Sequence, residues 1–294
     1  MKIKYDLLCY AKEKYDQLYL NWYLVNTGKA NSKKSSNDSV VFDKGIFIDD
    51  LTKIEKNKIN RKILFLYSNH MFRSDFSLPR LNPKKLVEAI ENRMDEVYEN
   101  NLEGFSYCYS QKVNETKGFD IDLLIYNEKT YFNILNIFAS KGIQFDECHY
   151  LPQLYQNFLK PELDNCFGIF NINNFIEIFF VNKNSYYKYE ILDLNKILDT
   201  KDIGVIGEEE MYNYITKKLI LYLKRHFYND PKINSIDNVY TNLRVDDLKK
   251  IPVLDDEAVN YIEINDHHEI YPYLNITNTL ISLPNGEKTD ESKK

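Results

Sequence analysis

Three groups of side chains in this sequence are of types that perform chemistry. Asp120 and Asp122 alternate with apolar residues, so both carboxylates would lie on one face of a strand, where they could hold a metal or act as an acid and a base. Metal-dependent nucleotidyl transfer would require a third carboxylate nearby. The alternation with Ile121, Leu123 and Ile125 favours a solvent-facing polar stripe opposite a buried one.

The other two groups contain histidine. In residues 266–269, His267 and His268 are flanked by carboxylates, but neighbouring residues of a strand point to opposite faces and cannot easily share one ion. A solvated loop is the favoured interpretation. The same geometry separates Cys148 from His149, and no carboxylate is identifiable that would orient a nucleophile and its base. No GxSxG, HExxH, Walker A or CxxC motif occurs, so nothing positive supports catalysis.

Composition narrows the function classes. The chain has 294 residues and a net charge of −6 without a basic block, which argues against nucleic acid as the main partner. The cysteines form no CxxC pair and lie in apolar surroundings, which predicts free, buried thiols in a reducing compartment. Charged residues near the start and the lack of an apolar run of about 20 residues predict a cytoplasmic protein without a membrane span.

Hydrophobic periodicity predicts strands and helices in alternation. Asn82 and Pro83 are typical of a helix start, and Gly142 is typical of a helix end. In the first half we expect strands at 5–10, 18–25, 62–67, 70–77, 105–111, 119–126 and 143–150, and helices from 82, at 129–141 and at 152–159. In the second half we expect strands at 169–171, 175–181, 186–192, 238–241 and 258–264, and helices at 208–227 and 245–250.

Both halves mix sheets with helices, so the fold class is α/β. We predict a first subdomain over residues 1–160, in which residues 80–160 form an α/β insertion, and a second subdomain over residues 161–283. The polar residues 284–294 are predicted to be a disordered tail.

The order of these elements resembles the PilM and GspL proteins, the actin-like cytoplasmic components of type IV pilus and type II secretion assembly platforms. Three segments carry the resemblance: residues 63–79, closing on a Leu-Pro step before a Glu-rich helix; residues 121–154, where a helix ends at Gly142; and the meander of residues 166–192. Together they span most of residues 5–265. The resemblance implies an actin-like (ribonuclease-H-like) duplicated fold, with two facing subdomains of mixed sheets flanked by helices.

PilM-type members bind ATP through three glycine-bearing loops, because a phosphate that approaches a backbone N–H leaves no room for a Cβ atom. The first loop position here holds Tyr-Ala-Lys-Glu (residues 10–13), expected as a turn, and the third holds Asn-Leu-Arg (residues 242–244). At the second, Asn171 replaces the carboxylate of the metal shell, Asn173 replaces the glycine, and Glu177 stands where a hydroxyl residue is expected. The resemblance therefore implies a degenerate site without nucleotide, metal or catalytic residues.

As a non-enzymatic scaffold, such a protein would bind a short N-terminal peptide of a bitopic membrane protein of the platform. The resemblance also implies contact with the assembly ATPase, leaves a homodimer open, and implies a cytoplasmic location at the inner membrane. Strand addition along a groove between subdomains is a plausible binding mode, with Tyr186 and Tyr187 as candidate anchors. Two alternatives stay open: an actin-fold ATPase or kinase with rearranged phosphate loops, and a nucleotidyltransferase-like enzyme using Asp120 and Asp122.

Overall fold

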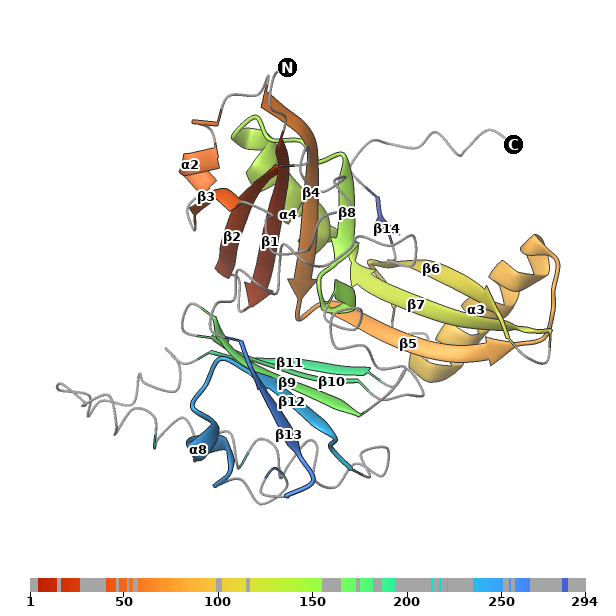
Figure 1. The fold of residues 1–294 in the computed structure, drawn as a ribbon. Coiled ribbons are helices and arrows are strands. Elements are labelled where there is room, and N and C mark those ends of the chain that lie inside the picture. Colours follow the sequence, from red (N-terminus) through yellow and green to blue (C-terminus); the bar gives the residue numbers. More distant parts are fainter. Residues whose placement is uncertain are drawn as a thin grey trace. The chain divides into compact units, whose positions relative to one another are not determined.

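The chain folds as two compact units, Met1–Gln153 together with Ile276–Lys294, and Leu154–Asn275. The structure is a computed structural model, and it describes residues 5–14, 17–26, 41–45, 48–51, 53–54, 58–98, 102–114, 117–154, 165–172, 175–181, 187–193, 213, 217, 221, 235–250, 254, 257–264 and 282–284. Each unit is built around its own sheet (Figure 1).

The sheet of the first unit has six strands in the order β14-β8-β4-β1-β2-β3. Strands β1, β2 and β3 form an antiparallel meander, β4 and β8 run parallel to β1, and β14 pairs antiparallel with β8 at the edge. The strands are β1 (Tyr5–Lys14), β2 (Gln17–Asn26), β3 (Val41–Gly45), β4 (Ile59–Ser68), β8 (Glu147–Tyr150) and β14 (Ser282–Leu283).

The predicted turn at residues 10–13 is wrong. These four residues continue β1 and stay in register with β2, from Tyr10 opposite Asn21 to Glu13 opposite Leu18. All four are buried, including Lys12 and Glu13. In sequence, polar residues after an apolar run predict the end of a strand. Here the Glu13 carboxylate accepts a hydrogen bond from Ser68 of β4, so the strand continues past its last apolar residue.

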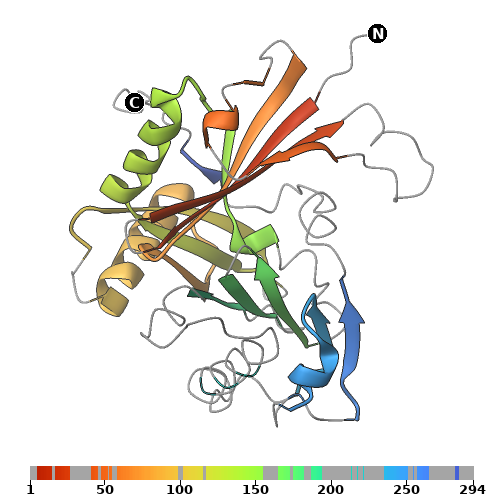
Figure 2. The same ribbon diagram turned by 90° about the vertical axis from the view of Figure 1, so that its left-hand side faces the viewer.

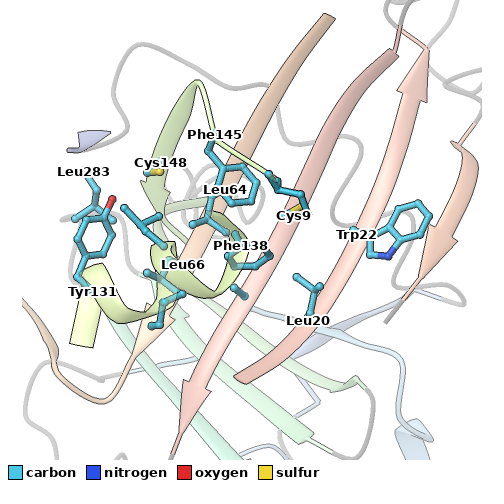
Figure 3. Close-up of a cluster of buried hydrophobic side chains, with 14 of the residues drawn as sticks. Cys9, Leu20, Trp22, Leu64, Leu66, Tyr131, Phe138, Phe145, Cys148 and Leu283 are labelled. Atoms are coloured by element: carbon cyan, nitrogen blue, oxygen red, sulfur yellow. The ribbon is translucent and has the colours of Figure 1, made fainter. Parts of the chain in front are cut away.

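The core of the first unit lies between this sheet and helix α4 (Glu128–Ser140) (Figure 3). Asn127 caps the helix, since its side chain accepts the Thr130 N–H at 2.9 Å, and Gly142 follows the helix end with φ of 74°. The predicted helix and its glycine stop are confirmed. The side chains that meet in this layer are Cys9, Leu20, Leu64, Leu66, Cys148, Tyr131, Phe138 and Leu283, among others.

A second layer of the first unit is inserted between β4 and β8. It is a three-stranded sheet in the order β5-β7-β6 with helix α3 on one face (Figure 1; Figure 2). Its elements are β5 (Met71–Leu78), α3 (Pro83–Tyr98), β6 (Phe105–Val113) and β7 (Phe119–Asn127), and its core holds Leu86, Ile90, Met94, Ile121, Leu123 and Ile125. Asn82 accepts the Lys85 N–H at 2.9 Å, which confirms the predicted helix start.

The sheet of the second unit repeats the topology of the first. Its order is β11-β10-β9-β12-β13, in which β9, β10 and β11 form an antiparallel meander and β12 and β13 run parallel to β9. The elements are β9 (Cys166–Ile172), β10 (Phe175–Val181), β11 (Tyr187–Asp193), β12 (Asn238–Thr241), α8 (Val245–Leu248) and β13 (Asn260–Glu263). The predicted meander is confirmed, and β9, β10, β12 and β13 correspond to β1, β2, β4 and β8.

Residues 276–283 are predicted in the second subdomain, but in the structure they belong to the first unit. Ser282 and Leu283 pair with His149 and Cys148 of β8, so this segment belongs to the first unit. The predicted helix at 208–227 is described only at three residues, each of them helical, and residues 285–294 lie outside the described part. All four cysteines are free thiols. Among the described helices, none has the length and apolar character needed to cross a membrane.

Candidate functional site

The candidate site lies at the carboxyl ends of the parallel strands in each unit. Ligands of open α/β sheets bind in the crevice outside the carboxyl ends of the strands, at the topological switch point where the strand order reverses. In the first unit the edge is formed by the ends of β1 and β4, and in the second by the ends of β9 and β12. The resemblance places the first phosphate loop after β1, the second after β9 and the third after β12.

In the second unit, the side chain of Asn242 joins the two strand ends. Its Oδ1 accepts the Asn171 N–H at 2.8 Å, and its Nδ2 donates to the Asn171 carbonyl at 2.8 Å. The amide therefore satisfies both backbone groups of Asn171, as a neighbouring strand would. A phosphate that used this N–H would have to displace Asn242.

A second hydrogen bond fixes the turn after β12. The fully buried Thr241 hydroxyl accepts the Leu243 N–H at 2.9 Å, which is a side-chain-to-backbone turn typical of serine and threonine. The Thr241 carbonyl accepts the Ile264 N–H at 2.7 Å. Two backbone N–H groups at this edge, those of Asn171 and Leu243, are thus bonded to side chains of the same unit.

Glu177 is an internal residue of β10 and not a residue that faces a ligand. Its side chain is 0% exposed, and its Oε2 accepts a hydrogen bond from the Tyr189 hydroxyl at 3.1 Å. Asn173 lies outside the described residues, so its predicted role as a replaced glycine stays a prediction.

The first unit repeats the same arrangement with other residues. The Ser68 hydroxyl, at the end of β4, donates to the Glu13 carboxylate, near the end of β1, at 2.6 Å. The same oxygen accepts the His70 N–H at 3.0 Å, as Thr241 accepts the Leu243 N–H. In both units, therefore, the strand corresponding to β4 ends in a hydroxyl residue that closes its own turn, and a side chain at this edge binds the neighbouring strand.

The two aspartates of β7 are engaged separately. Arg73 donates to both oxygens of Asp122, at 2.6 and 2.7 Å, and Gln153 adds a bond of 3.1 Å. Asp120 accepts from Ser77 at 2.7 Å and Asn114 at 3.0 Å, and these two hydrogen bonds lower its pKa. The predicted solvent-facing stripe holds for the exposed Asp120, whereas Asp122 is partly buried against Arg73 and the same face of β7 continues into the buried Leu124 and Tyr126. Among the described residues no three His, Cys, Asp or Glu side chains are grouped as metal ligands, and within that part no third carboxylate joins Asp120 and Asp122.

Cys148 and His149 face opposite sides of β8, as predicted. The Cys148 thiol lies in the core near Tyr131, and burial raises its pKa to about 11, which makes it a poor nucleophile (Figure 3). The His149 Nε2 lies 3.1 Å from the Glu147 carboxylate.

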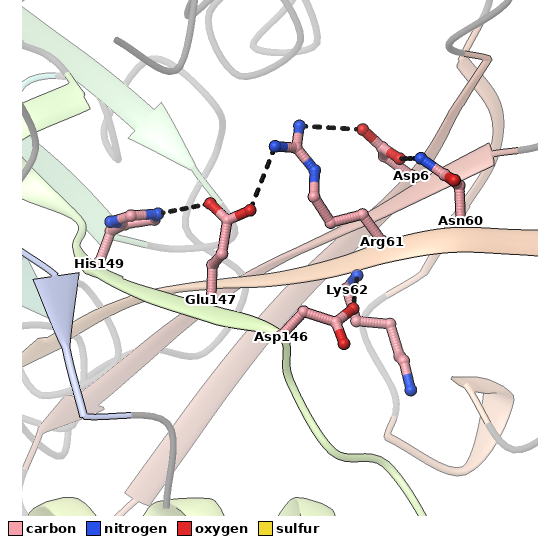
Figure 4. A network of polar contacts seen from close by, with 7 residues as sticks. All are labelled: Asp6, Asn60, Arg61, Lys62, Asp146, Glu147 and His149. Atoms are coloured by element: carbon pink, nitrogen blue, oxygen red, sulfur yellow. Dashed lines mark hydrogen bonds and ion pairs between the residues drawn. The ribbon is translucent and has the colours of Figure 1, made fainter. Parts of the chain in front are cut away.

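Glu147 belongs to a charged network at the opposite, amino-terminal edge of the parallel strands (Figure 4). The Arg61 guanidinium contacts Glu147 at 3.2 Å and Asp6 at 3.1 Å, and thereby links the starts of β4, β8 and β1. This geometry holds neighbouring strands in place. It also corrects one expectation, since a carboxylate, that of Glu147, does contact His149, although Cys148 faces the other side of the strand.

Three further sequence predictions lie outside the described residues or are only partly described. Residues 266–269, with both histidines, are not described, and neither is Tyr186. Tyr187 is described only as the first residue of β11, so its predicted role as an anchor stays a prediction.

Solved structures share the fold of this chain over nearly its whole length. The cytoplasmic domain of EpsL, an inner membrane component of the type II secretion system of Vibrio cholerae, matches with a TM-score of 0.55 and 9% identity, over 91% of this chain and 92% of that one. A PilM–PilN type IV pilus biogenesis complex matches with a TM-score of 0.59 and 7% identity, over 92% of this chain and 94% of that one. The fold is actin-like. The resemblance predicted from sequence is confirmed at the level of the fold.

No family model and no curated protein sequence matches this chain. At identities of 7% and 9% the likeness shows the fold alone. It does not show which side chains of this chain have a function. The side chains of the site include partners that sequence patterns did not identify, namely Ser68, Thr241 and Asn242. The signal that could have found them is local: a hydroxyl residue at the end of a strand followed by Asn, as in Thr241-Asn242, is typical of a turn in which side chains bind the backbone.

Proposed function

We propose that this protein is a cytoplasmic scaffold of a type IV pilus or type II secretion assembly platform at the inner membrane, and that its actin-like fold binds partner proteins and no nucleotide. One observation carries the proposal. The strand ends at which the resemblance places phosphate loops are joined by side chains of the protein itself, through Asn242 in the second unit and Ser68 in the first.

Phosphate recognition by a loop depends on backbone N–H groups that are free to turn toward the ligand, usually with glycine beside them. At this edge the Asn171, Leu243 and His70 N–H groups each have a side-chain acceptor. Binding a phosphate there would break hydrogen bonds that the native state already makes. The positions of Asn171 and Glu177 also offer no free carboxylate for a metal shell, because Glu177 is fully buried.

The partner side of the proposal follows from the similar structures. One of them is a complex of PilM with PilN, and the other is the cytoplasmic domain of an inner membrane component. We therefore propose that this chain binds the short cytoplasmic N-terminal peptide of a bitopic platform protein, and the assembly ATPase of the same system.

The test is the affinity for that peptide. A fluorescent synthetic peptide with the N-terminal cytoplasmic residues of the bitopic protein from the same organism is titrated with the full chain, and a peptide of scrambled sequence is the control. We expect saturable anisotropy for the native sequence alone. Equal curves for the two peptides, or no binding up to about 1 mM protein, a limit at which even an interaction of about −4 kcal/mol is half-saturated, would reject the partner proposal.

The competing function is that of an actin-fold ATPase or kinase. It requires that the edge residues rearrange on binding, so that Asn242 leaves Asn171 and frees its N–H. A nucleotide that stabilises the folded chain would favour this alternative.

A further inference from the structure

The outer strand of the inserted sheet has an unpaired edge. In the order β5-β7-β6, β6 pairs with β7 alone among the strands that the structure describes, and Figure 1 shows it on the side of the sheet away from β5. Its nine residues, Phe-Ser-Tyr-Cys-Tyr-Ser-Gln-Lys-Val, contain no proline, no glycine and one charge. Long edge strands of this kind pair readily with another strand unless they are interrupted or covered.

The alternation of the ladder shows which backbone groups point outward. At one end the Asn114 N–H donates to the Gly118 carbonyl, and at the other the Glu128 N–H donates to the Gly104 carbonyl. Even-numbered residues therefore bond to β7, and odd-numbered residues turn their N–H and C=O groups to the outside. Within the described part of the chain, no acceptor is bonded to the outward N–H groups of Tyr107, Tyr109 and Gln111.

We infer that β6 pairs antiparallel with β6 of a second copy of this chain, about a two-fold axis at Tyr109, and forms a continuous six-stranded sheet. Tyr109 is the middle residue of β6, so this register uses the full length of the strand. It places Tyr109 opposite Tyr109 of the second copy, and Tyr107 opposite Gln111, all of which have outward backbone groups. An isologous pairing of one strand with itself is the usual way in which an edge forms a closed dimer.

The charges at the two ends of the strand fit this register. Ser106 falls opposite Lys112 of the second copy in a non-hydrogen-bonded pair, the kind in which side chains approach most closely. The Ser106 hydroxyl donates to the exposed Glu128 carboxylate. In the proposed register, the Lys112 ammonium group of the second copy therefore lies next to this carboxylate. By symmetry, the dimer contains two such Lys112–Glu128 pairs.

The helices above the sheet leave room for this arrangement. A two-fold axis perpendicular to the sheet keeps α3 and its copy on the same face. Helix α3 packs on β7 through Ile121, Leu123 and Ile125, and β7 lies three strand spacings, or about 14 Å, from its copy. Two helices of about 10 Å diameter fit side by side over this distance.

The experiment is sedimentation equilibrium of the full chain across a range of protein concentrations. Gln111 is exposed, and its N–H faces away from β7, so Gln111→Pro removes a bond to the second copy while the bonds to β7 stay. Gln111→Ala is the matched control, since it shortens the same side chain and keeps the N–H group. We expect a reversible wild-type dimer, a similar dissociation constant for Gln111→Ala, and an increase of about tenfold or more for Gln111→Pro, because two hydrogen bonds are lost per dimer.

A charge exchange tests the register independently of any backbone effect. Lys112→Glu and Glu128→Lys should each weaken the dimer, and the double variant should restore it, whereas the pairing of Lys112 with Asp120 in its own chain would not be restored. A wild-type chain that stays monomeric, equal dissociation constants for Gln111→Pro and Gln111→Ala, or a double variant as weak as the single ones would each overturn the inference. The dimer is independent of the proposed peptide binding, so failure of one leaves the other intact.

Discussion

At the residue scale, side-chain hydrogen bonds join the ends of neighbouring strands at the edge where we propose that no nucleotide binds. Asn242 binds both backbone groups of Asn171, and Ser68 binds Glu13 in the equivalent position of the first unit. A side-chain amide is the only natural group that offers one donor and one acceptor in the geometry of a peptide bond. The Asn242 amide engages the Asn171 N–H, a donor that a phosphate at this strand end would need. The Ser68–Glu13 bond joins two side chains, and the same Ser68 oxygen accepts the His70 N–H.

We predict that Asn242→Ala lowers the free energy of unfolding by about 1–3 kcal/mol, because the half-buried Asn171 N–H and C=O both lose their partner. Asn242→Asp should cost at least as much at neutral pH, since a carboxylate oxygen would face the Asn171 carbonyl. Urea unfolding measures both values. Asn260→Ala is the control, because its amide is exposed and donates to the Asn238 side chain at 3.1 Å, and it should cost under about 0.5 kcal/mol. Equal values for Asn242→Ala and this control would contradict the prediction.

At the element scale, aromatic packing between β9 and β10 determines where a glycine is required. A Cβ atom on Gly168 would lie 2.5 Å from Cδ2 of Phe179 and 3.0 Å from Cε2 of Phe170, and Phe179 also stacks on Tyr189 with ring centroids 5.0 Å apart. The glycine in β9 thus lets these rings approach the strand. It serves the core of the second unit and not a ligand.

We predict that Gly168→Ala lowers the free energy of unfolding by about 1–3 kcal/mol through overpacking, measured by urea unfolding. Gly104→Ala is an informative comparison, because its Cβ would meet open space but its φ is +77°. That variant should cost about 1 kcal/mol for backbone reasons alone. A neutral Gly168→Ala would show that Phe179 moves aside freely.

The elements that could be predicted from sequence are those decided by local signals. Helix α4 has its cap at Asn127 and its stop at Gly142, and the first half of β7 alternates between polar and buried apolar residues. The end of β1 could not be predicted, because Glu13 is kept in the strand by Ser68, 55 residues away in sequence. At the site, the missing glycines are visible in the sequence, whereas the contact of Asn242 with Asn171 depends on the pairing of β9 and β12.

At the scale of the whole molecule, one topology occurs twice, and the chain ends by returning to the first unit. Each sheet has a three-stranded antiparallel meander followed by two parallel strands. The last described strand, β14, pairs with β8, and Leu283 enters the core beside Tyr131 and Cys148 (Figure 3). The Tyr131 hydroxyl also donates to the Pro284 carbonyl. The first unit is therefore complete only when the C-terminal segment is in place.

We predict that Leu283→Ala lowers the free energy of unfolding by about 2–5 kcal/mol, because the side chain is 4% exposed and its removal leaves a cavity. Amide hydrogen exchange should increase in β8 and α4. Val97→Ala, on the exposed face of α3, is the matched control and should cost under about 0.5 kcal/mol. An unchanged exchange rate in β8 would mean that β14 contributes little to the unit.

The central proposal is that this actin-like chain binds partner proteins and no nucleotide. The most direct test is its melting temperature with and without MgATP, with MgCl2 alone and MgCTP as controls for ionic effects. A site with a Kd of about 10 µM would add about 2.7 kcal/mol at about 1 mM ligand, which is a rise of several degrees. We predict no change of melting temperature. A rise that increases with MgATP concentration and is absent with MgCTP would contradict the account.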